Sequence, residues 1–323
     1  MNNLDVACIG LAVGNICVRP VSENIFDADV TQVDTIESLP GGDALNQSII
    51  LARLGNKPVL ISKMAEDDFG KSMCNSLKHN GVETGYIAKS HMEGTSVCII
   101  LIQEDGQRNF CTYKGALRSF SAEDIDLAVI DSCKVVSIGG LMALPSFDKD
   151  GAREIFQYAK NKGKITVADT KYDSYHIGYQ GIKSLLPYTD YFFPSYDEAA
   201  YLSGEKEVEK IADFFLAEGA KHVGIKLGGK GAYIKDEQFN EIIPCFGNEV
   251  VDTTGAGDNF MAGFLHGILR GWSTKECALF GNATGAVCVS KVGANTAVTD
   301  SAVVYEVLRT TQEGRNLLTK INE

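Results

Sequence analysis

Short apolar runs alternate along the chain with segments of helical periodicity. The runs are typical of strands buried on both faces of a sheet, and they cover residues 6–9, 135–139, 165–168, 191–193 and 223–227. Apolar residues recur at helical spacing between them, at about 150–161, 196–202 and 207–217, and in a last amphipathic segment at about 300–318. The alternation predicts an α/β fold with a predominantly parallel central sheet flanked by helices.

Two segments interrupt this alternation with β-branched and aromatic residues. Residues 95–102 and 108–113 flank an Asp-Gly pair, which predicts a hairpin, and residues 30–36 have the composition of an exposed antiparallel strand. A lone hairpin is marginal in water, so we expect these strands to form one small sheet. The predicted organisation is a core of residues 1–14, 41–94 and 115–323 and a discontinuous β lid of residues 15–40 and 95–114.

The composition of the chain argues against some classes of binding partner. The 323 residues carry 30 Lys and Arg against 42 Asp and Glu, a net charge of −12, which argues against a nucleic-acid or anionic-membrane partner. The nine cysteines contain no Cys-x-x-Cys pair and read as reduced thiols. No basic segment followed by an apolar run opens the chain, and no run is long enough to span a bilayer, so we expect a cytoplasmic protein.

Three small residues, Gly255, Ala256 and Gly257, stand where a helix is expected to begin, because apolar residues recur at helical spacing from Phe260 onward. The first amides of a helix lack internal partners, and the helix dipole adds partial positive charge there. With little side chain in the way, these amides can approach an anion. The pattern predicts a phosphate-binding site.

Asp258 follows these small residues directly. A carboxylate in this place would repel a bound phosphate, but it makes sense as a base that takes the proton of a hydroxyl attacking the phosphorus. It also fits an ordinary helix start, where an acidic residue suits the dipole. The residues alone leave both interpretations open.

A glycine pair, Gly41-Gly42, precedes Asp43 and Asn46 at the start of an apolar helix that ends at Gly55. Two glycines let the backbone approach a ligand, and Asp43 and Asn46 stand one helical turn apart on the same face. The alternative is a strand-to-helix turn in which Asp43 is only a cap.

Both stretches resemble signatures of the ribokinase family, also called the PfkB carbohydrate kinases. The C-terminal pattern Asp-Thr-x-Gly-Ala-Gly-Asp is filled at every fixed position of residues 252–258, and a Gly-Gly pair with an Asn before an Ala-Arg-Leu-Gly ending is matched at residues 41–55. The resemblance implies a ribokinase-like fold with Asp258 as the base and the amides of residues 255–258 as an anion hole. It also implies sugar contacts from Gly41, Gly42, Asp43 and Asn46.

Two departures from the family pattern concern the substrate. The family places a substrate-binding Asp where this chain has Asn15, and ribokinase itself has Lys where this chain has Asp43. An amide can still bind a sugar hydroxyl, so the departures affect the identity of the substrate more than catalysis. Asn15 also fits an ordinary turn residue.

The family's Asn-x-x-Glu motif is matched with Ser195 in place of Asn and with Glu198 kept. The resemblance implies that Glu198 helps to hold Mg²⁺ through water, although the pair fits a capping box equally well. Asp169 ends a predicted strand at the edge where the site is expected, and the family has a comparable Asp there. Arg108 is a candidate for a substrate oxygen or acid group, or else a surface residue of the lid.

Residues 224–231 satisfy a P-loop pattern but place Gly231 where Ser or Thr must contact Mg²⁺, and a strand pattern follows, so we reject a P-loop. The resemblance instead places Gly228 and Gly231 in a turn near the nucleotide, with Lys226 toward the phosphates and Asn282 beside the adenine. A tight hairpin without ligand contacts is the alternative.

The resemblance also suggests a monovalent cation, K⁺, near Asp252, Thr254 and Gly293. Together these features predict an ATP- and Mg²⁺-dependent kinase that transfers the γ-phosphoryl group to a hydroxyl of a sugar or related polyol. The family further implies a homodimer joined through the β lid. Two alternatives stay open, a nucleoside kinase of the same family and a catalytically silent sugar-binding regulator.

Overall fold

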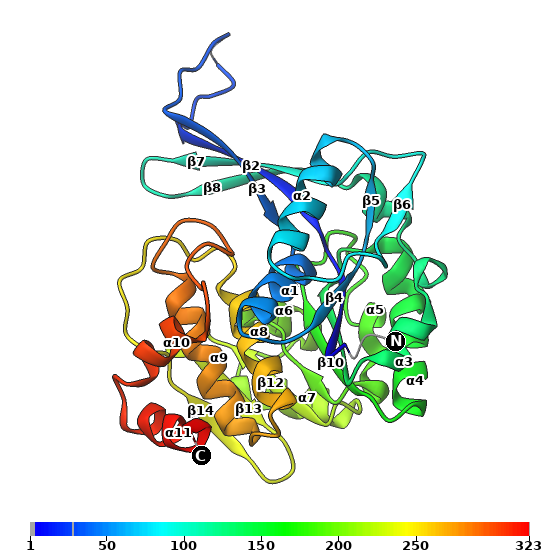
Figure 1. Cartoon of the computed structure of the whole chain (residues 1–323), viewed down its shortest axis with the longest axis vertical. Helices are drawn as coiled ribbons and strands as arrows, with labels where there is room; N and C mark the ends of the chain where they lie inside the picture. Colours follow the sequence, from blue (N-terminus) through cyan, green and yellow to red (C-terminus); the bar gives the residue numbers. More distant parts are fainter. Residues whose placement is uncertain (1–3, 28, 323) are drawn as a thin grey trace.

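The computed structural model describes residues 4–27 and 29–322, and an eight-stranded sheet forms its centre (Figure 1). The strand order is β14-β13-β12-β11-β10-β9-β1-β4, in which β13 and β14 are antiparallel additions to a parallel sheet. The bounds are β1 Val6–Gly10, β4 Pro58–Ile61, β9 Val135–Leu141, β10 Ile165–Thr170, β11 Tyr191–Phe192, β12 His222–Lys226, β13 Ala232–Lys235 and β14 Asn240–Ile243. The predicted parallel sheet is confirmed.

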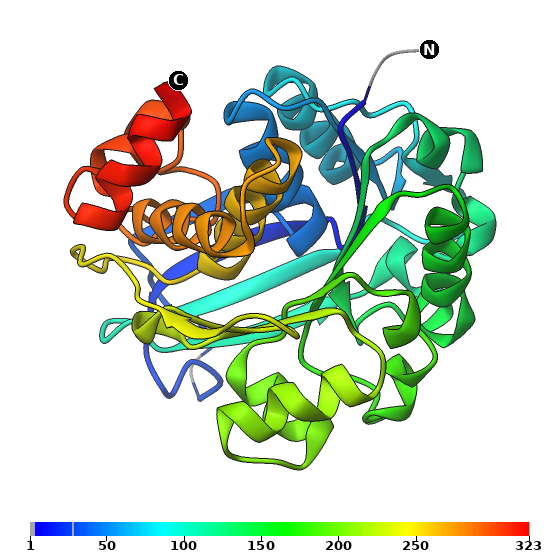
Figure 2. The same cartoon turned by 90° about the horizontal axis from the view of Figure 1, so that it is seen from below.

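Helices cover both faces of this sheet, as Figure 2 shows. One layer contains α1 Asp43–Arg53, α2 Asp68–His79, α8 Ala256–Leu269, α9 Thr274–Cys288, α10 Ser301–Leu308 and α11 Gln312–Asn322. The other contains α3 Leu127–Ser132, α4 Ala152–Asn161, α5 Gln180–Lys183, α6 Tyr196–Ser203 and α7 Val208–Ala217. Successive strand residues point to opposite faces, so Val6 and Cys8 pack into the first layer and Ala7 and Ile9 into the second.

A separate four-stranded sheet stands beyond the end of β1 (Figure 1). Its order is β3-β2-β7-β8, with bounds β2 Val13–Val21, β3 Thr35–Gly41, β7 Val97–Gln103 and β8 Arg108–Tyr113. We call this sheet the lid. A third, two-stranded sheet pairs β5 Lys63–Ala65 with β6 Ala88–Ser90.

The lid differs from the sequence prediction in two respects. The strand expected at 30–36 begins only at Thr35, and β2 pairs with β7 in parallel, although the β2–β3 and β7–β8 pairs are antiparallel as expected. The parallel pairing is allowed because α1, β4 and α2 separate β3 from β7 and supply a long crossover. Local sequence patterns carry no information on such a pairing.

The helix expected at 300–318 is divided between α10 and α11. The chain turns back so tightly that a Cβ atom on Gly314 would lie 2.0 Å from the carbonyl oxygen of Leu308. Thr310 and Thr311 lie between the two helices, and β-branched residues are poor helix formers. Within the described residues, no helix is both long and apolar enough to cross a membrane.

Candidate active site

The N-terminus of α8 lies where the sequence predicted it. Gly255 is the N-cap residue with a φ of 77°, and a Cβ atom there would lie 2.3 Å from the Cβ atom of Ala294. Only glycine fits this position without strain. The amide of Ala256 donates to the carbonyl of Thr253 at 3.2 Å, so helix geometry leaves the amides of Gly257 and Asp258 for an external acceptor.

Asp258 is held by two asparagines from distant parts of the chain. Asn46 on α1 donates from Nδ2 to Asp258 Oδ2 at 2.7 Å, and Asn295 donates from Nδ2 to Asn46 Oδ1 at 3.1 Å. Because Asn295 occupies the carbonyl side of Asn46, the amide side of Asn46 must face Asp258. Asn295 had no predicted role, since its contact with Asn46 spans 249 residues of sequence.

Burial, and then the carboxylate of Asp43, raise the pKa of Asp258 well above its usual value. Asp43 lies at the start of α1 and accepts a hydrogen bond from Lys171 Nζ at 3.1 Å. Its second oxygen, Oδ2, is buried without a hydrogen-bond partner among the described residues. A Cβ atom on Gly140 would lie 2.8 Å from that oxygen, so glycine leaves room beside it. We call the polar site formed by Asp43, Asn46, Lys171 and Asp258 the crevice.

Lys226 adjoins the anion-binding end of the same crevice. Its ammonium group pairs with Asp169, and a Cβ atom on Gly257 would lie 3.5 Å from Lys226 Nζ. Burial disfavours the charge on Lys226, but Asp169, Glu198 and Asp258 outweigh burial and raise its pKa. The structure therefore places Asp169 against Lys226, and Lys226 beside the first turn of α8.

Glu198 makes the contacts of a capping box and also faces the crevice. Its Oε2 accepts hydrogen bonds from the Ser195 amide at 2.9 Å and from Thr170 Oγ1 at 2.8 Å, and Ser195 caps the Glu198 amide. The described part of the chain holds no cluster of three or more His, Cys, Asp or Glu side chains suited to a metal. Mg²⁺ usually takes one or two protein carboxylates together with substrate phosphates, so Glu198 fits that ion.

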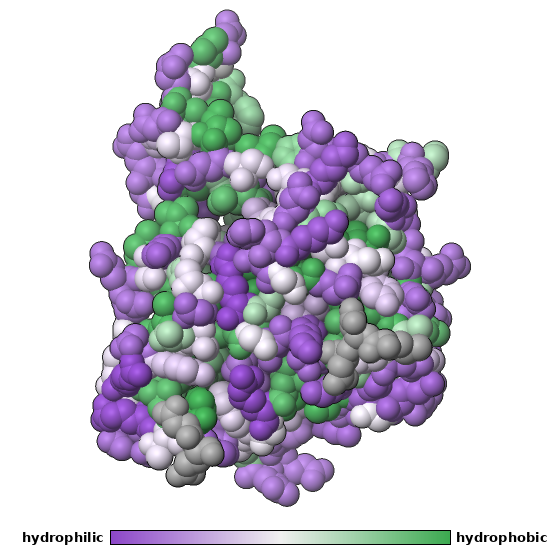
Figure 3. All heavy atoms as spheres, viewed as in Figure 1, coloured by the Kyte–Doolittle hydropathy of each residue, from purple (hydrophilic) through white to green (hydrophobic). Residues whose placement is uncertain are grey.

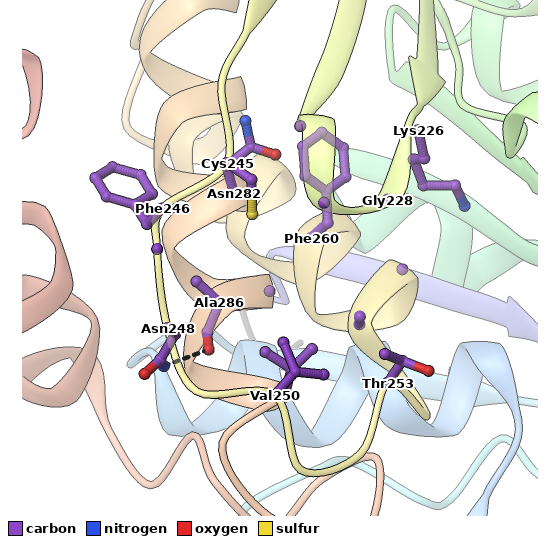
Figure 4. A pocket seen from close by; sticks show the side chains of 17 residues that line it. Lys226, Gly228, Cys245, Phe246, Asn248, Val250, Thr253, Phe260, Asn282 and Ala286 are labelled. Atoms are coloured by element: carbon purple, nitrogen blue, oxygen red, sulfur yellow. Dashed lines mark hydrogen bonds between the residues drawn. The ribbon is translucent and has the colours of Figure 1, made fainter. Parts of the chain in front are cut away.

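A cavity of about 470 Å³ opens beside the α8 N-terminus (Figure 4). Figure 4 shows Phe246, Asn282 and Phe260 toward one end of the cavity, with Lys226 and Thr253 on the side of the α8 N-terminus. The volume and the largely apolar lining suit a nucleotide-sized ligand. Four residues predicted on the nucleotide side all line it, namely Lys226, Gly228, Gly231 and Asn282.

The rejection of a P-loop is confirmed, because the Gly228–Lys230 turn leads into strand β13 and no helix follows. Gly231 has a φ of 97° and passes so close to Ile243 that a Cβ atom would lie 2.0 Å from its carbonyl oxygen. Asn282 donates to the carbonyls of Ile243 and Pro244 at 2.8 and 3.1 Å. Its amide group thus fixes the wall of the cavity.

Asn15 lies on strand β2, on the face of the lid that looks toward the core. A Cβ atom on Gly41 would lie 2.1 Å from Asn15 Nδ2, so Gly41 is needed for this side chain to pack over the start of α1. Gly42 has a φ of 96° and directly precedes α1. These three residues therefore border the crevice beside Asp43.

Arg108 reaches from the lid to the loop before α8 instead of to the crevice. Its guanidinium donates to Asp252 Oδ1 at 3.0 Å, to Thr253 Oγ1 at 3.0 Å, and to Thr254 Oγ1. Asp252 also accepts hydrogen bonds from the amides of Thr254 and Gly293, each at 2.9 Å. Burial opposes the charge on Asp252, but these hydrogen bonds and Arg108 lower its pKa.

Comparison with known proteins places this arrangement among sugar kinases. Residues 3–301 match the model of the pfkB family carbohydrate kinases. The chain is 31% identical over 274 residues to a 2-dehydro-3-deoxygluconokinase of Bacillus subtilis, covering 81% of this chain and 84% of the relative. It is 26% identical over 304 residues to a probable fructokinase-5 of Arabidopsis thaliana, covering 88% and 94%.

The fold agrees with solved structures of the same group. An Arabidopsis thaliana ribokinase complexed with ribose and ATP superposes with a TM-score of 0.82 at 25% identity, covering 96% of this chain and 100% of that chain. The predicted ribokinase-like fold is confirmed. With both sequence signatures at one crevice and a family match over nearly its whole length, the chain belongs to the pfkB family of carbohydrate kinases.

Proposed function

We propose that this protein transfers the γ-phosphoryl group of ATP to a hydroxyl group of a sugar or related polyol. One observation carries the proposal, which is the position of Asp258 between a polar crevice and an apolar cavity. The crevice contains Asp43 and Asn46, and the cavity adjoins the first turn of α8. A base at the junction of an acceptor site and a nucleotide site suits phosphoryl transfer.

The chemistry follows from groups that the chain itself supplies. Asp258 takes the proton of the acceptor hydroxyl while its oxygen forms a bond to the γ-phosphorus and the bond to ADP breaks. The amides of Gly257 and Asp258 bind the charge that develops on the transferring group. Lys226, beside Gly257, adds a positive charge on the nucleotide side.

Mg²⁺ would be held by Glu198, through water, and would neutralise charge on the phosphates of ATP. Thr170 and the Ser195 amide orient the Glu198 carboxylate by hydrogen bonds of 2.8 and 2.9 Å. The capping-box contacts therefore do not compete with this role. They engage Oε2 of Glu198, and no hydrogen bond from the described residues engages Oε1.

Two lysines near Asp43 favour an acceptor that carries an acid group within the sugar class. Lys171 Nζ lies 3.1 Å from Asp43 Oδ1, and Lys114 Nζ donates to the Ala143 carbonyl at 3.2 Å. Burial lowers the pKa of Lys114 and Lys171 lowers it further, although Asp148 and Asp43 oppose the shift. A carboxylate of the acceptor would relieve this repulsion. The name of the Bacillus subtilis relative, 2-dehydro-3-deoxygluconokinase, describes an acceptor of that kind.

A homodimer joined through the lid is part of the proposal. The face of the lid that points away from the core exposes Ile36 and Ile99, with relative exposures of 67% and 39%. Ile16, Val18 and Leu101 lie on the same face by the strand register. Figure 3 shows apolar residues on the lid, and others scattered among the hydrophilic residues of the core. A second copy would cover those on the lid.

The direct test is ADP release from ATP with a panel of acceptors that contains fructose, ribose, 2-dehydro-3-deoxygluconate and adenosine. We expect release that depends on a sugar or a sugar acid. Adenosine as the preferred acceptor would favour the nucleoside-kinase alternative. Tight binding of a sugar, detected by calorimetry, without ADP release from any acceptor would favour the silent regulator.

A further inference from the structure

The loop before α8 holds a half-buried cluster that joins it to the lid. Asp252 and Thr254 belong to the loop, and Arg108 belongs to strand β8 of the lid. Chain segments 144 residues apart in sequence meet at this ion pair. The side chains of Arg108 and Asp252 keep relative exposures of only 27% and 18%, so the pair is much less hydrated than a surface salt bridge.

Oδ1 of Asp252 already has a full set of donors, and Oδ2 has one. Oδ1 accepts from the Thr254 amide at 2.9 Å, from Thr254 Oγ1 at 2.7 Å and from Arg108 at 3.0 Å, and Oδ2 accepts from the Gly293 amide at 2.9 Å. A carboxylate offers about four lone-pair sites, about two on each oxygen, so the three donors leave no room on Oδ1, while Oδ2 keeps about one free site.

A monovalent cation therefore does not fit between Oδ1 of Asp252 and the Thr254 hydroxyl, because the guanidinium of Arg108 occupies that place. The hydroxyl of Thr254 contacts both Arg108 and Asp252, so this oxygen is engaged as well. A K⁺ ion placed here would also meet the fixed positive charge of the guanidinium. The positive charge that the family motif suggests here is already present, as the guanidinium group of Arg108.

We propose that Arg108 takes the place of a monovalent cation at Asp252 and Thr254, so that the lid supplies the charge that orders the anion-binding loop. The inference rests on the proposed kinase function. Gly255 follows Thr254 directly and starts α8, so the position of Thr254 sets where the amides of Gly257 and Asp258 point. Closure of the lid over the acceptor and ordering of the loop then become one event.

Two variants test this proposal. Turnover and melting temperature are measured in K⁺ and in tetramethylammonium, which is too large to replace K⁺. The wild type should show the same turnover and the same melting temperature in both salts. Arg108→Ala should lose turnover by on the order of 10-fold, because small displacements of reacting groups are costly. In K⁺ it should regain part of that turnover and melt roughly 2 °C higher, because an ion bound only by the folded state stabilises it.

Arg19→Ala is the matched control, because the side-chain hydrogen bonds of Arg19 go to Glu37 and Thr35 inside the lid. It should behave like the wild type in both salts. Stimulation of the wild type by K⁺ would overturn the inference, as would an Arg108→Ala protein whose turnover and melting temperature both ignore K⁺. If no acceptor supports turnover at all, the proposed function fails by itself, and the melting temperatures still decide the role of Arg108.

Discussion

At the scale of single residues, the account depends on one carboxylate in an unfavourable place. Asp258 is 8% exposed and lies near a second carboxylate, Asp43, with its partner Lys171 alongside. A carboxylate whose surroundings destabilise its charged form is a stronger base than an exposed carboxylate. The surrounding fold tolerates this arrangement because Asn46 and Asn295 orient the carboxylate.

The pH dependence of turnover should report this environment. Because a base must be deprotonated and the pKa of Asp258 is raised, kcat/KM should fall as the pH falls through that raised pKa. Asp43→Asn removes a negative neighbour, so the pKa of Asp258 should drop and the acidic limb should move to lower pH. The measurement is the pH profile of kcat/KM for both proteins. A limb that stays in place, or moves to higher pH, would contradict this role of Asp43.

Sequence reasoning found the site residues that belong to motifs and missed those that the fold brings in. Asp258 and Asn46 stand in recognisable strings, and the structure brings them within 2.7 Å. Lys171 and Gly140 follow or end ordinary apolar strands, and nothing local distinguishes them from other residues at strand ends. Their proximity to Asp43 results from the order of strands in the sheet, which local patterns do not encode.

At the scale of elements, α8 combines a rigid packing face with an open first turn. A Cβ atom on Gly263 would lie 2.5 Å from Thr284 Oγ1, where α8 packs on α9. A Cβ atom on Gly257 would meet nothing closer than Lys226 Nζ at 3.5 Å, which is ordinary contact. One glycine therefore serves the helix contact, and the other leaves space in front of the amides.

These two glycines should respond differently to alanine. Gly257→Ala should fold as stably as the wild type, because alanine favours a helix. It keeps the amide of residue 257 but places a methyl group in the space in front of the amides, so kcat should fall by up to about 10²-fold, which is what the loss of one such donor costs. Gly263→Ala should instead lower stability by about 1–3 kcal/mol through overpacking. Urea unfolding and steady-state turnover measure both effects. A Gly257→Ala protein with normal kcat would mean that the phosphoryl group binds elsewhere.

Helices and strands were predictable where one hydrophobic periodicity dominated the segment. They were less predictable where pairing with a segment distant in sequence determined the structure. The parallel core strands and the start of α8 were predicted at their observed positions. The start of β3, the parallel β2–β7 pair and the break between α10 and α11 were not. Each of these depends on contacts between segments that are not neighbours along the chain, or on a tight turn whose geometry the residues only permit.

At the scale of the whole molecule, the two faces of the lid differ in what covers them. Its inner face buries Cys17, Cys98 and Ile100 in a small separate cluster. Its outer face leaves Ile36 and Ile99 in contact with water. A sheet with one apolar face uncovered is stabilised by association.

Replacing both Ile36 and Ile99 by Lys should therefore convert a dimer into monomers. Each isoleucine buried in an interface contributes about 1.5–3 kcal/mol, and two buried lysines add an unfavourable desolvation. Sedimentation velocity measures the change. Leu127→Lys is the control, since Leu127 is similarly exposed at 40% but lies on α3, away from the lid. A wild type that sediments as a monomer at all concentrations would contradict the expectation.

The central claim, that Asp258 is the base, is tested most directly by turnover and thermal stability of Asp258→Asn. We predict a kcat lower by about 10²–10⁴-fold, the usual contribution of a general base. The raised pKa means that the folded state loses stability as pH rises toward that pKa, so the neutral amide should keep or raise the melting temperature at neutral pH. Asp190→Asn, which removes the partner of Lys160 and Lys221, should lower stability and leave kcat intact. Near-normal turnover by a folded Asp258→Asn protein would contradict the account.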